Sequence, residues 1–374
     1  MDRARLAKSN IVIKTARNIQ RAYVMDEDAR GAYREDVRLG IERQRLMTES
    51  FKKTDGQPLV TRRALALAHV LDHMTIYIQD WEAIVGNPTE SPRHLPYAIE
   101  ENWRSVWKLV NTEAGRTLLD DKGKAELKEL CAYWDGKSMI DIHQKYFTER
   151  MKEDWKFEGT FLWSLWTEGA IPNYEKIVNG GLRFYIEEAN ARLKEIDRTV
   201  PPDYMAQRNF LEAVVISLEA AIRFAHRYAG KADELAGKEK DSVRIKELAT
   251  IAETCRRVPE HPARTFREAL QSFFFVHTIT RQIEYMMYGI GARFDVLMNP
   301  FYVKDLAKGR ITREEAMELL KLLWVKFEEA GRVYSPFLSG VYGGSQIVQA
   351  LTLGGVDANG KDVTNETTYL VLDT

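Results

Sequence analysis

The hydrophobic positions between residues 247 and 302 predict a long, buried helix at the centre of the fold. Apolar side chains recur there at intervals of three and four residues, the spacing of one helix face. That face consists of Phe266, Ala269, Leu270, Phe273, Phe274 and His277. Phe275 and Val276 widen it, which indicates burial from several sides. Thr265 before the run and Glu268 three residues later form the pattern of a capping box at the helix start.

Gly289 and Gly291 interrupt this helical pattern, and an Arg-Phe-Asp segment follows at 293–295. A capped helix that leads into a Gly-rich exit with a fixed Arg and Asp is typical of a pocket wall. A core helix followed by an ordinary loop is the alternative that the pattern leaves open.

The same periodicity predicts a mainly helical protein. The expected helices cover residues 60–74, 99–115, 121–134, 209–229 and 311–330. Asp80 is positioned to cap a short helix that stops at Gly86-Asn87, and Thr364 or Asn365 to cap a last one. Residues 230–248 are charged and predict a linker, and only 350–353 resemble a strand. The last apolar run has no C-cap when Thr374 is reached, so we expect the natural polypeptide to continue.

Composition narrows the classes of partner. The chain has 374 residues, 45% of them hydrophobic, and a net charge of −1, so no strong field favours nucleic acid or an anionic membrane. No run of about 18 apolar residues predicts a membrane span, and the charged N-terminus does not resemble a signal peptide. We therefore expect a cytoplasmic protein. Cys131 and Cys255 lack CxxC spacing, which predicts neither a disulfide framework nor a zinc site.

Common catalytic motifs are absent from the sequence. It contains no phosphate-binding Gly-rich loop, no GxSxG elbow and no HExxH pair. Glu49, Glu82 and Asp295 are isolated acids, and His226 beside two arginines is more typical of a structural histidine. The segment 155–182 is rich in Trp and Phe and leads into several glycines, which is typical either of a pocket lining or of a core plug.

Several ordered stretches resemble the glycyl radical enzymes of the pyruvate formate-lyase superfamily, especially the glycerol and diol dehydratase-like branch. The stretches are RQRLMTESFKKTDGQPLVTRRALALAHVL, WEAIVGN, VISLEAAIRFAHRYAGKADELA, ELATIAETCRRVPEHPARTFREALQSFFFVH, GARFDVLMNPFYVKDLAKGRIT, LLWVKFEE and LTLGGVDANGKDVTNETTYLVLD. They span nearly the whole chain, and their common order makes the resemblance specific.

The resemblance implies an α/β fold, with residues 1–374 as the helix-rich N-terminal part of a ten-stranded barrel domain. It also implies a homodimer, a small-molecule substrate and a radical-SAM activating enzyme that places the radical on a backbone glycine. A barrel Cys then abstracts hydrogen from the substrate, and a Glu two positions later serves as the base. These residues normally lie downstream of Thr374, and neither Cys131 nor Cys255 stands in the family's Gly-Cys-x-Glu loop. We therefore expect no catalytic residue and no metal in this chain, and an inactive fragment when it is taken alone.

The resemblance also implies a substrate-facing wall within this chain. Gly169 stands where dehydratase-type members carry a substrate-binding His, and Met287-Tyr288 stands where they carry a His-Ser pair. The predicted substrate-binding residues are Trp163, Trp166, Gly169, Met287, Tyr288, Phe337 and Tyr342. Arg293 and Asp295 are interpreted as an internal ion pair that fixes the barrel wall, not as substrate contacts.

The predicted function is radical cleavage of a C–C or C–O bond, by a lyase or a dehydratase, in a substrate less polar than glycerol. Loss of the His and Ser donors underlies this prediction, because a buried hydroxyl left unpaired costs about 1–3 kcal/mol. An acyltransferase of the formate acetyltransferase type is one alternative. A non-catalytic helical scaffold, or degenerate paralogue, is the other.

Overall fold

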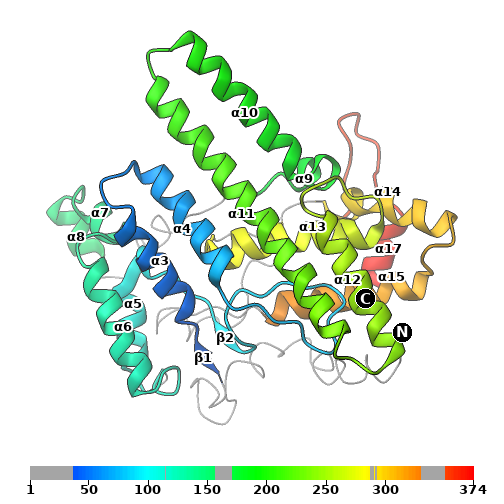
Figure 1. The fold of residues 1–374 in the computed structure, drawn as a ribbon, viewed down its shortest axis with the longest axis horizontal. Helices are drawn as coiled ribbons and strands as arrows, with labels where there is room; N and C mark the ends of the chain where they lie inside the picture. The colour runs from blue at the N-terminus through cyan, green and yellow to red at the C-terminus, as the bar shows by residue number, and fades with distance from the viewer. Residues whose placement is uncertain (1–36, 114, 156–170, 287–289, 291–292, 330–349) are drawn as a thin grey trace.

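The computed structural model describes residues 37–113, 115–155, 171–286, 290, 293–329 and 350–374. Helices dominate this part of the chain (Figure 1), as the sequence predicted. No helix within it is long and apolar enough to cross a membrane.

The N-terminal half of the described chain is a helical layer with one small parallel sheet. β1 (Arg38–Leu39) pairs with β2 (His94–Leu95), with Arg38 opposite His94. The helices of this layer are α3 (Glu42–Lys53), α4 (Leu59–His73), α5 (Ile99–Val110), α6 (Asp121–Trp134), α7 (Met139–Gln144) and α8 (Glu149–Trp155). α3 packs on α4, and α5 packs on α6.

A long helical hairpin follows and projects from the body of the molecule (Figure 1). After the short α9 (Tyr174–Gly180), it consists of α10 (Leu182–Thr199) and α11 (Tyr204–Ala236). α11 packs along α4, α10 and α12 (Ser242–Arg257). The charged stretch 230–248 is therefore helical at both ends and not a linker, because burial of Ala232 and Leu248 in the core extends both helices into it.

The predicted central helix is confirmed as α13 (Phe266–His277), which continues as a π-helix, η2 (Thr278–Ile283). Thr265 caps it, with its hydroxyl accepting a hydrogen bond from the Glu268 amide at 3.2 Å. The Glu268 carboxylate turns back to the amide of Arg264, one residue earlier than in a standard capping box. α14 (Phe294–Ala307), α15 (Arg313–Glu329) and α17 (Glu366–Leu372) complete the C-terminal half, and Asn365 caps α17 as predicted.

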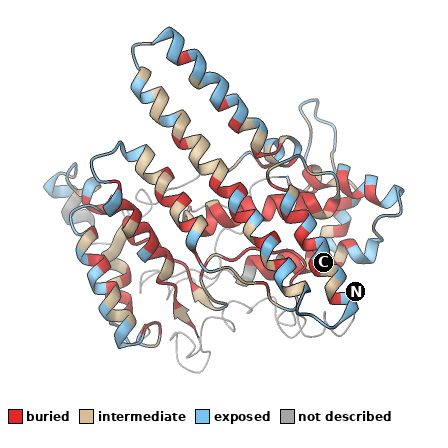
Figure 2. Ribbon diagram, viewed as in Figure 1, coloured by how far each residue is buried: buried red, intermediate tan, exposed pale blue. Residues whose placement is uncertain are grey.

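α13 lies between two hydrophobic clusters and is buried along its length (Figure 2). Phe275 joins the cluster of α3–α6, α11 and α12, together with Ile279 and Ile283 of η2. Phe273 and Phe274 face the cluster formed with α14 and α15. The width of the apolar face that the sequence showed is explained by this double contact.

Two predictions in the C-terminal half are wrong. Arg293 and Asp295 form no ion pair with each other. The Arg293 guanidinium donates to the carbonyl of Val356 at 2.7 Å. The buried Asp295 carboxylate accepts from the backbone amide of Gly354 at 2.8 Å and from the Thr368 hydroxyl. Residues 350–353 contribute an isolated parallel bridge, Arg293 with Thr352, and not a strand. The side chains of Arg293 and Asp295 thus connect the start of α14 to the segment that follows residue 350.

A buried charge cluster ties η2 to the N-terminal layer. The Arg43 guanidinium donates to both oxygens of Glu100 at 2.9 and 2.7 Å and to the carbonyl of Ile283 at 2.6 Å. Arg63 bridges Glu100 and Glu284, at 2.8 Å to each. Burial alone raises the pKa of the Glu100 carboxyl, but the attraction of Arg43 and Arg63 outweighs it and lowers the pKa to about 2.

We predict that Glu100→Gln lowers the free energy of unfolding at pH 7 by about 3–5 kcal/mol, because it leaves two partly or fully buried guanidiniums short of a counter-charge. The folded-state pKa lies below the unfolded value, so the stabilisation is present above about pH 4.5 and is lost as pH falls towards about 2. Urea unfolding of both proteins from pH 8 to pH 3 measures it. A stability difference that stays constant below pH 4.5 would contradict the assignment.

Candidate functional site

A segment of irregular backbone, residues 75–89, runs beside α13, and residues 82–87 of this segment are buried. The sequence predicted a short helix here, capped by Asp80, but no residue from 75 to 89 is helical. Glu82, Val85 and Asn87 of this segment are all 0% exposed. Buried backbone amides and carbonyls need hydrogen-bond partners, and outside a helix this segment obtains them from other elements.

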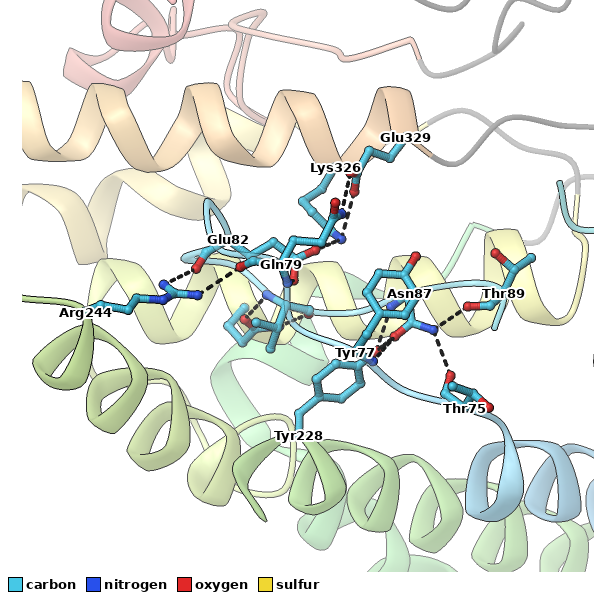
Figure 3. A network of polar contacts seen from close by, with 12 residues as sticks. Thr75, Tyr77, Gln79, Glu82, Asn87, Thr89, Tyr228, Arg244, Lys326 and Glu329 are labelled. Atoms are coloured by element: carbon cyan, nitrogen blue, oxygen red, sulfur yellow. Dashed lines mark hydrogen bonds and ion pairs between the residues drawn. The ribbon is translucent and has the colours of Figure 1, made fainter. Parts of the chain in front are cut away.

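Side chains of α11, α12 and α13 supply those partners. Figure 3 labels the partners from α11 and α12, Tyr228 and Arg244. Gln271 accepts from the amide of Val85 at 2.9 Å and donates to its carbonyl at 2.7 Å. Arg244 donates to the carbonyls of Glu82 and Gln79, at 2.9 Å to each. The hydroxyl of Tyr228 accepts from the amide of Asn87 at 2.8 Å. These interactions replace the ladder of a helix or sheet and fix the segment's path.

Gly86 lies close to Phe274 of α13. Its φ of +144° is one that residues with a side chain rarely adopt, and a Cβ there would lie 3.0 Å from a ring carbon of Phe274. Gly86, which the sequence predicted to end a helix, is instead needed because a side chain at this position would collide with Phe274.

A lysine and two carboxylates form an ion cluster where the segment meets the end of α15. Lys326 and Glu82 are 3% and 0% exposed and form an ion pair, and Lys326 also lies 3.0 Å from Glu329. Gln79 donates from its side chain to Glu329 at 2.7 Å and from its amide to Glu82 at 2.9 Å. Figure 3 shows the four side chains meeting between the segment and α15.

Burial and the neighbouring charges of the ion cluster together determine the protonation of Glu82. Burial is the largest influence and raises the pKa of the Glu82 carboxyl to about 7; Lys326 lowers the pKa and Glu329 raises it. For Lys326 burial lowers the pKa, but Glu329 and Glu82 together raise it above the ordinary value. Lys326 is thus a fixed cation, whereas Glu82 can gain or lose a proton near neutral pH.

A buried histidine in an aromatic setting lies at the junction of α13 and η2. His277 is 1% exposed, and its Nδ1 lies 3.1 Å from the hydroxyl of Tyr174 at the start of α9. Its ring stacks on Phe273 and meets the edge of Phe327, with centroids 6.2 and 4.9 Å apart. The histidine and the ion cluster together form a wall that combines apolar surface with a few polar groups, as is common in small-molecule sites.

The seven residues predicted to contact substrate lie outside the described residues, so their prediction stays untested. They are Trp163, Trp166, Gly169, Met287, Tyr288, Phe337 and Tyr342. Of the described residues near those segments, Tyr174 contacts His277, and Glu329 is the last residue of α15. The backbone amide of Ile290 donates to the carbonyl of Ala350 at 3.1 Å.

Neither cysteine belongs to this wall. Cys131 and Cys255 are buried in the other hydrophobic cluster, with α6 and α12. Burial raises the pKa of the Cys131 thiol to about 12, and burial likewise raises the pKa of Cys255 above its ordinary value. Within the described residues, no group of three or more His, Cys, Asp or Glu side chains is arranged to hold a metal ion.

Other acids and histidines singled out in the sequence have structural partners on the outer surface. Glu49 lies 3.2 Å from His69, and His226 lies 3.0 Å from Glu260, which Arg183 also contacts at 2.7 Å. In the sequence, Glu82 stands out only as an isolated acid, and Lys326 was not predicted to belong to a site. The signal was present, since each interrupts an apolar run, WEAIV and LLWVKF, and a charge on a buried face needs a partner.

Comparison of the whole chain with known proteins assigns it to a family. The model of the pyruvate formate lyase-like family matches residues 9–374. The chain belongs to this family, whose members named below include glycyl radical lyases and dehydratases.

Individual relatives support the assignment. The isethionate sulfite-lyase of Nitratidesulfovibrio vulgaris is 35% identical over 367 residues, covering 90% of this chain and 42% of the relative. The structure of the 1,2-propanediol-dehydrating protein of Roseburia inulinivorans superposes with a TM-score of 0.83 at 32% identity, covering 90% of this chain and 41% of that protein. The B12-independent glycerol dehydratase of Clostridium butyricum gives a TM-score of 0.80 at 32% identity, with 95% and 45% covered. The chain thus spans about two-fifths of the length of these relatives.

We predict that Glu82 makes the protein less stable as pH rises through neutrality. The folded-state pKa of about 7 exceeds the unfolded value. The contribution of Glu82 to the free energy of unfolding is therefore fully present below about pH 4.5 and is lost as pH rises through about 7. Relative to Glu82→Gln, the wild type should lose up to about 3 kcal/mol of unfolding free energy between pH 5 and pH 8.

Urea unfolding at several pH values tests this dependence. Glu100→Gln is the matched control, because the pKa of that buried carboxyl is shifted in the opposite direction. A wild-type advantage over Glu82→Gln that grows with pH would show that Lys326 dominates and that Glu82 stays ionised.

Proposed function

We propose that this chain is part of a glycyl radical enzyme that cleaves a C–C or C–O bond in a small organic substrate. The observation that carries the proposal is the family match over residues 9–374, together with relatives named as lyases and dehydratases. In this proposal a partner radical-SAM enzyme generates the glycyl radical, and the thiyl cysteine, the base and the radical glycine lie in the rest of the polypeptide. The enzyme is proposed to act in the cytoplasm as a homodimer.

The role proposed for this chain is to bind and orient the substrate. The family resemblance implies that Gly169 stands in place of a histidine of the dehydratases and Met287-Tyr288 in place of a His-Ser pair. A polyol hydroxyl buried there would lack donors, at about 1–3 kcal/mol for each missing hydrogen bond. We therefore propose a substrate less polar than glycerol, an aryl or alkyl carboxylate. The aromatic surroundings of His277 are compatible with such a substrate.

A sulfonate is a second candidate substrate, with C–S cleavage as the reaction. The observation in its favour is the 35% identity with an isethionate sulfite-lyase over 90% of this chain. Release of sulfite distinguishes this reaction from decarboxylation, which releases CO2, and from dehydration, which leaves an aldehyde or ketone.

The full-length enzyme, activated under anoxia by its radical-SAM partner, should convert an aryl or alkyl carboxylate much faster than glycerol or 1,2-propanediol. Mass spectrometry of products from a panel of carboxylates, diols and isethionate measures this. Turnover of glycerol at a rate comparable to any carboxylate would exclude the less polar substrate. Failure to form any glycyl radical signal would exclude the enzyme class.

Restoring the missing donors should move the preference towards diols. Gly169→His combined with Tyr288→Ser is expected to raise kcat/KM for 1,2-propanediol by roughly 10- to 100-fold, the kinetic equivalent of one or two regained hydrogen bonds. Tyr288→Phe is the matched control, since it changes the same position without adding a small hydroxyl, and should give no gain. Equal activity of both variants on the diol would refute the role given to these positions.

A further inference from the structure

A small cavity separates the segment at residues 86–94 from η2 and the end of α15. Its volume is about 10 Å³. Apolar walls are contributed by Pro88, Phe274 and Phe327, and polar ones by Thr278, Gln282, Lys326 and Glu329. It adjoins the ion cluster but is lined by polar side chains of η2 that the cluster does not use.

Gln282 and Thr278 bring unused hydrogen-bonding groups to this cavity. They are 2% and 1% exposed, and within the described part of the chain neither side-chain amide atom of Gln282 nor the Thr278 hydroxyl has a hydrogen-bond partner. Other buried glutamines of this protein behave differently: Gln271 pairs both amide atoms with Val85, and Gln44 donates to the carbonyl of Tyr97 at 2.6 Å. Buried side-chain amides are nearly always paired in folded proteins, so a partner for Gln282 is expected.

The spacing of the two residues and the size of the cavity define that partner. Thr278 and Gln282 are four residues apart in η2, about one turn, and both line the same space. A cavity of about 10 Å³ corresponds to one water-sized sphere, and a buried water requires two to four polar neighbours. Lys326 can donate and Glu329 can accept on the opposite side. An organic substrate is too large for this space.

We propose that this cavity binds one ordered water molecule, held by the Gln282 amide and the Thr278 hydroxyl on η2 and by the lysine-carboxylate cluster at the end of α15. The water joins η2 to the ion cluster and so extends the polar network of the buried segment across the wall. The site is independent of which substrate the enzyme converts.

A crystal structure of the full-length enzyme at about 1.5 Å resolution tests the site directly. The expected result is a density peak at hydrogen-bonding distance, about 2.6–3.2 Å, from a side-chain amide atom of Gln282 and from at least one of Thr278, Lys326 and Glu329. A protein group of the remaining polypeptide paired with Gln282, or a cavity without density, would overturn the proposal.

Substitution gives a second, independent test in the same full-length protein. Gln282→Met and Thr278→Val should each lower Tm, and the double variant should lose less than the sum of the two shifts, because both side chains bind one shared water. Gln44→Met with Thr278→Val is the matched control and should be additive, since Gln44 is satisfied by other protein groups. Strict additivity for Gln282→Met and Thr278→Val would refute a shared water. If the double variant does not fold, the crystal structure of the wild type decides alone.

Discussion

The structure depends on the ability of side chains to satisfy the backbone of residues 75–89. An irregular segment that is buried away from water costs free energy at every unpaired amide and carbonyl. Gln271, Arg244 and Tyr228 remove that cost from three different helices. The positions of α11, α12 and α13 relative to one another are therefore linked through a segment that has no regular structure of its own. The lysine-carboxylate cluster and the small cavity both lie along this segment.

Two buried charge clusters in the same protein have opposite effects on their carboxyl groups. Glu100 faces two guanidiniums, and its pKa is lowered in spite of burial. Glu82 shares one ammonium with a second carboxylate, and its pKa is raised. Depth of burial does not distinguish them, because both are nearly inaccessible. The local balance of charges decides whether the buried acid is ionised, and only the cluster with excess negative charge can exchange a proton near neutral pH.

The sequence allowed the helical part of the fold to be predicted, because periodicity and capping are local properties. The apolar face of α13, its Thr265 cap and the Asn365 cap were all readable in this way. The path of residues 75–89 was not, because its partners Gln271, Arg244 and Tyr228 lie 141 to 186 residues away in the sequence. The same holds for the Glu82–Lys326 pair, whose members are 244 positions apart. The resemblance to a family indicated where a substrate would bind, but a pairwise contact of this kind is defined only by the tertiary structure.

The position of α13 between two hydrophobic clusters has a consequence for how the chain loses its structure. Phe275 belongs to one cluster and Phe273 to the other, so neither half of the molecule can open without exposing part of the same helix. Exposure of the α13 backbone to solvent therefore requires unfolding of the whole molecule and not of one part. The projecting end of the α10–α11 hairpin, where Val200 and Met205 are more than half exposed, can unfold locally. Amide hydrogens of α13 should thus exchange with solvent at the rate of whole-molecule unfolding, and those at the tip of the hairpin orders of magnitude faster. Among the described helices, α13 is therefore expected to exchange the most slowly.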